Sequence, residues 1–130
     1  MKPSCNFYEL NKNGLIEEAN FLKSTNFDAR PKDKSINMVV IHSISLPPNK
    51  FGGTYIEDFF TNKLKIEKNS YFKKIKGLKV SPHFLIKRSG ELVQFVSCKD
   101  RAWHAGKSNW GKNSNCNDFS IGIELEGSDL

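Results

Sequence analysis

The sequence predicts an α/β fold, in which a β-sheet packs against amphipathic helices. Residues 38–41 form an unbroken run of Met, Val, Val and Ile. Such a short, β-branched run is typical of a buried inner strand with both faces covered. Residues 119–126 alternate apolar and polar side chains, which predicts a second strand with one packed face. Between these strands, apolar residues recur at helical spacing over residues 54–64, which predicts a helix that covers the sheet.

The length and charge of the chain fit one globular domain. We expect a single domain over residues 1–130, with a weakly patterned segment at residues 1–20. The formal charge is +6, and lysines are concentrated in residues 63–79 and 99–112. No Arg-rich or aromatic-interleaved motif accompanies them, which favours a solvated surface over a nucleic-acid site. No segment resembles a membrane span or a signal peptide, so we expect neither nucleic acid nor membrane as a partner.

The cysteines do not suggest a disulfide framework. Cys5, Cys98 and Cys116 are scattered and odd in number, which favours reduced thiols in the cytoplasm. They form no CxxC pair, so we expect no zinc site built from cysteines. A nucleophilic Cys98 or Cys116 is a weak alternative, because nothing in the sequence favours the thiolate of either residue.

Two helices are expected in the middle of the chain. Thr54 and Glu57 have the spacing of a capping box at the start of the helix over residues 54–64. Residues 69–76 predict a second short helix with apolar residues inward and lysines outward. Gly77 is suited to end this helix.

The second half of the chain predicts a hairpin, a loop and the last strand. Residues 84–87 and 91–96 flank the turn residues Ser89 and Gly90, a pattern typical of a β-hairpin. Residues 101–118 predict a long polar loop, and such loops are often functional. In the strand that follows, Glu124 projects from the polar face, where a neighbouring glycine leaves room for a ligand.

The histidines allow a metal-site hypothesis. His42, His83 and His104, with Glu124 as a base, could build a zinc hydrolase site of three ligands and an open position for water. No two of these histidines have a local metal-binding spacing, so each histidine taken singly fits a hydrogen-bonded structural role better than a metal-binding one. The segment around Trp103 suits a flat sugar or peptide surface, or else a loop that a buried tryptophan anchors.

Six motifs occur in chain order: VVIH at 39–42, ISLPP at 44–48, FGG at 51–53, VSPHFLI at 80–86, RAWHAG at 101–106 and CNDFSIGIELEG at 116–127. Together they resemble the N-acetylmuramoyl-L-alanine amidases of the type-2, peptidoglycan-recognition-like family. They are most similar to the cytoplasmic branch that cleaves 1,6-anhydro-N-acetylmuramyl peptides in cell-wall recycling. The segment over residues 24–31 also resembles the entry loop of this branch.

The resemblance implies a mixed central sheet flanked by helices and hydrolysis of the amide between the muramyl lactyl group and L-alanine. His42 matches the first ligand of a Zn²⁺ ion, and Glu124 matches the catalytic acid/base. Trp103, His104 and Ala105 match the wall of the substrate groove. On this mapping the substrate is a peptidoglycan-derived muropeptide, and His83 and His104 do not ligate the metal. We also expect a cytoplasmic monomer.

The chain departs from the family pattern in ways that matter for activity. It stops before the segment in which the family has its other two zinc ligands, and before a long helix that covers one sheet face, so we expect a C-terminally incomplete domain. Ser43 and Asn115 stand where the family usually has Asn and Arg. Lys79 keeps a positive charge for a substrate carboxylate without the geometry of Arg. The alternatives are an inactive muropeptide-binding module and a non-functional truncated remnant.

Overall fold

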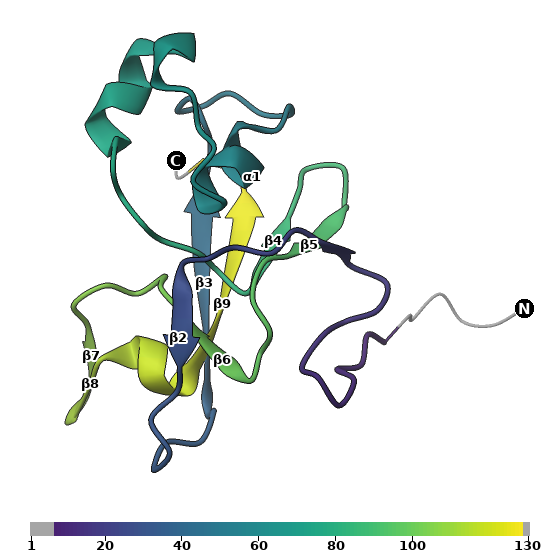
Figure 1. The fold of residues 1–130 in the computed structure, drawn as a ribbon, viewed down its shortest axis with the longest axis vertical. Coiled ribbons are helices and arrows are strands. Elements are labelled where there is room, and N and C mark those ends of the chain that lie inside the picture. Colours follow the sequence, from purple (N-terminus) through teal and green to yellow (C-terminus); the bar gives the residue numbers. More distant parts are fainter. Residues whose placement is uncertain (1–6, 129–130) are drawn as a thin grey trace, which may run out of the picture.

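A mixed five-stranded sheet forms the centre of the molecule, with strand order β1-β5-β4-β9-β3. The computed structural model describes residues 7–128 (Figure 1). Its two longest strands, β3 (Met38–Ile44) and β9 (Ser120–Glu126), run parallel side by side. The other elements are β1 (Asn20–Phe21), β2 (Phe27–Ala29), α1 (Tyr55–Phe60), the 3₁₀ segments η1 (Ile66–Lys68), η2 (Ser70–Ile75) and η3 (Cys116–Phe119), and strands β4 (Phe84–Ile86), β5 (Leu92–Gln94), β6 (Asp100–Ala102), β7 (Asn109–Trp110) and β8 (Asn113–Ser114).

The strand directions confirm the predicted α/β class with a mixed sheet. Strand β9 pairs in parallel with both β3 and β4, whereas β4 and β5 form the antiparallel hairpin that the sequence predicts. Gly90 occupies the turn of this hairpin with φ 90°, a conformation that favours glycine. The predicted long loop over residues 101–118 is wrong in detail, because it contains the end of β6 and the short elements β7, β8 and η3.

The main core lies between the sheet and the segments that follow β3. Helix α1 contributes Ile56, Phe59 and Phe60, and the sheet contributes Leu85 and Val93. The rings of Phe60 and Phe95 pack edge to face with centroids 5.4 Å apart. Helix α1 is therefore fixed on one face of the sheet by aromatic packing.

Both predicted helices differ from expectation. Helix α1 ends at Phe60, because Asn62 adopts a left-handed conformation with φ 62°. The side chain of Thr54 caps nothing, and Glu57 instead pairs with Lys87 at 2.8 Å, so the predicted capping box is wrong. The second predicted helix is the 3₁₀ segment η2, where Asn69 caps the backbone N–H of Tyr71.

Strand β3 is an edge strand of the described sheet, which corrects the prediction of an inner strand. Val39 and Ile41 are 58% and 56% exposed. The packing of β9 is also the reverse of the prediction that its apolar face is the packed one. Its polar residues Ser120 and Glu124 are buried on the α1 side, and its apolar Leu125 is exposed. The hydrophobic run predicts a strand correctly, but it does not specify whether a neighbour covers each face.

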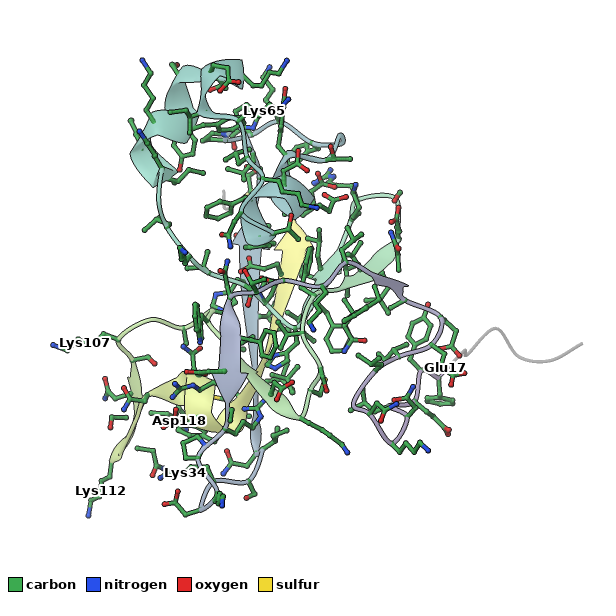
Figure 2. All side chains as sticks on the ribbon, viewed as in Figure 1. Glu17, Lys34, Lys65, Lys107, Lys112 and Asp118 are labelled. Atoms are coloured by element: carbon green, nitrogen blue, oxygen red, sulfur yellow. The ribbon has the colours of Figure 1, made fainter. Side chains whose placement is uncertain are left out.

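The lysine-rich segments lie on the surface. Lys65 projects at one end of the molecule, and Lys107 and Lys112 project at the other (Figure 2). Cys98 and Cys116 are buried free thiols, and burial raises the pKa of Cys98 to about 11, which disfavours its thiolate. Cys5 and the start of the predicted N-terminal segment lie outside the described residues.

Within residues 7–128, the structure contains no helix with both the length and the apolar character needed to cross a membrane.

Candidate functional site

One pocket brings together His42 and Glu124. They are register partners on the parallel strands β3 and β9, so their side chains leave the same face of the sheet. The pocket has a volume of about 220 Å³. We call it the His42–Glu124 pocket; it is lined by His42, Ser43, Ile44, Phe59, Phe60, Val80, Ser81, Trp103, His104 and Glu124.

Glu124 is a buried residue whose carboxyl group makes no hydrogen bond within the described residues. Glu124 is 8% exposed, and burial raises its pKa to about 7. A carboxyl group with this pKa can both accept and release a proton near neutral pH. Shifts of this kind, caused by burial in a pocket, are typical of functional groups.

His104 fills the space beside Gly122 that the sequence assigned to a ligand. A Cβ atom at Gly122 would lie 2.3 Å from Cγ of His104. The Nδ1 atom of His104 lies 3.0 Å from Nε2 of His42, and its Nε2 atom lies 3.0 Å from Oγ of Ser120. Burial, with a smaller effect of neighbouring His42, lowers the pKa of His104 to about 3. The ring is therefore neutral and tightly held at neutral pH.

A charged network holds Trp103 at the wall of the pocket. The indole N–H of Trp103 donates to Oδ1 of Asp28 at 3.2 Å. Arg101 donates to both carboxylate oxygens of Asp28, at 2.7 and 2.5 Å, and to Asp118 at 2.6 Å. Hydrogen bonding from Arg101 lowers the pKa of Asp28. The ionised carboxylate thus orients the indole ring.

The buried His83 and the half-buried Arg30 form a layer behind the pocket. His83 is fully buried, and its Nδ1 atom accepts a hydrogen bond from the backbone N–H of Gly122 at 3.1 Å. Its Nε2 atom lies 2.9 Å from the carbonyl oxygen of Asp100. Arg30 donates to the carbonyl oxygens of Cys98, Asn117, Asp118 and Ser120. These contacts fix β9 and give His83 a structural role.

Two of the predicted substrate residues do not line this pocket. Lys79 is exposed and lines a separate cavity of about 470 Å³ with Phe59, although its neighbour Val80 lines the His42–Glu124 pocket. Ala105 lines another cavity of about 470 Å³ along the edge of β3. The structure therefore brings His42, Trp103, His104 and Glu124 together, and leaves the binding roles of Lys79 and Ala105 as predictions.

The described residues do not by themselves fit a catalytic zinc ion. Such an ion needs three protein ligands and an open position. Within residues 7–128, no group of three or more His, Cys, Asp or Glu side chains is placed to hold a metal ion. In particular, both ring nitrogens of His104 are engaged by His42 and Ser120. The hypothesis of a zinc site built from His42, His83 and His104 is therefore not supported.

Sequence reasoning missed Asp28, Arg30 and Ser120. Asp28 lies in strand β2 and Arg30 follows that strand, and both contact residues that are distant in the sequence. Ser120 appeared as one polar residue of an alternating strand. The DxR spacing of Asp28 and Arg30 carries no local signal, and only the fold shows what these side chains contact.

Comparison with known proteins gives one consistent result. The family model described as N-acetylmuramoyl-L-alanine amidase matches residues 32–129. The 1,6-anhydro-N-acetylmuramyl-L-alanine amidase AmpD of Haemophilus influenzae is 50% identical over 115 residues, which cover 88% of this chain and 62% of that protein. AmpD of Escherichia coli K12 is 47% identical over 116 residues, which cover 89% and 63%.

A solved structure agrees with the sequence matches. The crystal structure of a selenomethionine AmpD derivative superposes with a TM-score of 0.90 at 47% identity, over 94% of this chain and 68% of that one. This likeness confirms the mixed α/β fold. The chain spans about 62% of the length of the curated relatives that it matches.

Proposed function

The chain belongs to the N-acetylmuramoyl-L-alanine amidase family, and from this membership we propose that it serves hydrolysis of the amide between 1,6-anhydro-N-acetylmuramic acid and L-alanine. The names of the AmpD relatives support this substrate. The muropeptides concerned arise from peptidoglycan, so the proposed role is in cell-wall recycling. The cytoplasmic location and monomeric state expected from the resemblance stay predictions.

The observation that carries this proposal is the pairing of His42 and Glu124 in one pocket. Strands β3 and β9 place them as register partners, and Trp103 forms part of the wall. The position of the paired residues at one face of a rigid sheet suits a reacting centre. An aromatic wall held by Asp28 suits the apolar face of a sugar ring.

Glu124 supplies the proton chemistry of the proposed reaction. Its carboxylate takes a proton from the water that attacks the carbonyl carbon of the lactyl amide. The C–N bond of the resulting tetrahedral adduct then breaks. Glu124 returns the proton to the leaving nitrogen of L-alanine, which leaves a free carboxylic acid and a free amine. The pKa of about 7 suits both transfers.

The zinc dependence expected from the resemblance stays a prediction. His42 is the proposed first ligand of Zn²⁺, and the ion when bound would act as a Lewis acid toward the water or the amide carbonyl. The described residues contain no complete ligand group.

The incomplete set of metal ligands favours a second candidate function. In this function, the described residues bind a muropeptide but do not by themselves cleave it. The pocket and its aromatic wall are present, whereas a group of three metal-binding side chains is absent from residues 7–128. Binding and hydrolysis can be separated by experiment.

The test uses the 130-residue chain and a chimera that carries, after Leu130, the remaining part of the Haemophilus influenzae relative. Calorimetry measures binding of a 1,6-anhydro-N-acetylmuramyl tripeptide, and mass spectrometry measures free tripeptide after incubation with Zn²⁺. We expect both proteins to bind and the chimera alone to release peptide. Release by the chain itself would reject the second candidate, and absence of binding by both folded proteins would reject both candidates.

A further inference from the structure

The hydrogen bonds around His104 assign it a positioning role toward His42. We infer that, in the chain without a bound ion, Ser120 and His104 hold His42 as its Nδ1–H tautomer. The inference deepens the proposed function and rests on it only for the part that His42 plays there. The chain of contacts runs from Oγ of Ser120 through both ring nitrogens of His104 to Nε2 of His42.

The geometry leaves His104 little freedom. Its two ring contacts are each 3.0 Å long, and its ring meets the ring of His42 edge to face, with an interplanar angle of 72°. Gly122 supplies the space for the ring, and the backbone N–H of His104 donates to Oδ1 of Asn117 at 3.1 Å. His104 therefore cannot turn away from either partner without losing packing.

The direction of donation in these hydrogen bonds follows from Ser120. Its hydroxyl is fully buried, and its one hydrogen bond among the described residues is with Nε2 of His104. A buried O–H that donates to nothing is costly, so the hydroxyl donates to Nε2. At about pH 8, above the ordinary pKa of histidine, the ring of His104 is neutral, and a neutral imidazole has one N–H and one acceptor nitrogen.

The positions of the ring hydrogens in His104 and His42 then follow. Since Nε2 of His104 accepts, its Nδ1 atom carries the hydrogen and donates to Nε2 of His42. The neutral His42 ring must carry its own hydrogen on Nδ1. Within residues 7–128 that nitrogen has no hydrogen-bond partner, so its N–H is available to a ligand of His42.

His83 provides an internal reference of opposite tautomer. Its Nδ1 atom accepts from the N–H of Gly122, and its Nε2 atom faces the carbonyl oxygen of Asp100. Because Nδ1 accepts, the neutral ring of His83 carries its hydrogen on Nε2, which donates to Asp100. The Nη2 atom of Arg30 also lies 3.2 Å from this Nε2 atom, but it donates to the carbonyl oxygens of Cys98 and Ser120. The same spectrum can therefore report both forms.

The test is long-range ¹⁵N–¹H NMR of the imidazole rings in the metal-free, substrate-free 130-residue chain at about pH 8, where histidines are neutral. We expect a protonated Nδ1 in His42 and a protonated Nε2 in His83. In Ser120→Ala the donor to His104 is lost, and His42 should change to the Nε2–H tautomer. His104→Ala should give the same change in His42, with His83 unaltered in both variants.

Ser24→Ala is the matched control, because Ser24 is equally buried and its hydroxyl donates to the carbonyl oxygen of Phe60 instead. It should leave the tautomer of His42 unchanged. An Nε2–H tautomer of His42 in the unsubstituted chain would overturn the inference. So would an Nδ1–H tautomer that persists in both folded variants, with folding judged from the His83 signals. The NMR samples contain neither substrate nor metal. A failed hydrolysis assay would therefore count against the proposed function and not against the tautomer of His42.

Discussion

Glu124 and His42 are direct partners across the parallel strands β9 and β3, although more than half of the chain separates them in the sequence. The pair places a buried carboxyl group beside an imidazole in one pocket. The described structure gives the carboxylate of Glu124 no hydrogen-bond donor, and burial raises its pKa to about 7. A charge held in this way costs folding free energy, as expected of a functional group rather than a structural one.

Glu124→Gln should stabilise the protein at high pH. Above pH 7 the folded protein holds a buried carboxylate that water solvates in the unfolded chain, whereas the variant has no charge to bury. The pKa of about 7 against the ordinary 4.5 sets a gain of at most roughly 3 kcal/mol in unfolding free energy. The gain should shrink as the pH falls from about 7 to about 4.5, since the carboxyl group is then neutral in both states. Urea unfolding at both ends of this range measures it.

Glu126→Gln is the control for this experiment. Glu126 is also buried on β9, but its carboxylate accepts hydrogen bonds from the backbone N–H groups of Gly52 and Arg88, at 2.8 and 3.0 Å. This variant should be less stable than the unsubstituted chain at high pH. A destabilised Glu124→Gln at about pH 8 would contradict the account of its buried charge.

Gly122→Ala should destabilise the fold and displace His104. The added methyl group would lie 2.3 Å from Cγ of His104, so the ring or the strand must move, at a cost of about 1–3 kcal/mol. Gly127→Ala, just beyond the same strand, meets no atom closer than 4.0 Å and should be nearly neutral. Thermal unfolding compares the two variants, and equal stabilities would show that His104 is not packed against Gly122.

Asp28→Asn should loosen Trp103 and weaken muropeptide binding. Asparagine cannot accept the two charge-assisted hydrogen bonds from Arg101, and the expected loss of stability is roughly 1 kcal/mol. The fluorescence of Trp103 should shift to longer wavelength, measured in a Trp110→Phe background because Trp110 is 69% exposed. Asp33→Asn, at an exposed aspartate, is the control. Unchanged fluorescence and binding would reject the role of Asp28.

Ile41→Lys should reduce self-association of the chain. Val39 and Ile41 project from an edge strand with more than half of their surface exposed, and exposed apolar edges promote aggregation. A lysine at position 41 should raise the monomer fraction in light scattering with little change in unfolding temperature. Val40→Lys, on the half-buried side of the same strand, should destabilise the fold instead.

The strands that carry His42 and Glu124 were predictable because their signals are local. A β-branched run and an alternating pattern identify β3 and β9 without knowledge of their neighbours. The hairpin of β4 and β5 was predictable for the same reason, since Ser89 and Gly90 mark its turn. The motifs around these strands also sufficed for the family resemblance, which the comparisons confirm.

The packed face of β9 was not predictable, because distant groups bury its polar residues. Arg30 binds the carbonyl oxygen of Ser120, and the N–H of Gly52 binds the carboxylate of Glu126. Neither contact leaves a pattern in the strand itself. The length of α1 depended likewise on Asn62, whose side chain is held by Asn26 across the fold.

Release of free tripeptide by the chimera and by its Glu124→Gln and Glu126→Gln variants tests the central claim most directly. Glu124→Gln removes the proton acceptor while keeping the shape of the side chain, so kcat should fall by about 10²–10⁴ with little change in the Kd for the tripeptide. Glu126→Gln should keep kcat within about tenfold of the unsubstituted chimera, because its carboxylate holds backbone rather than substrate. Turnover by a folded Glu124→Gln chimera at the unsubstituted rate would contradict the role of Glu124.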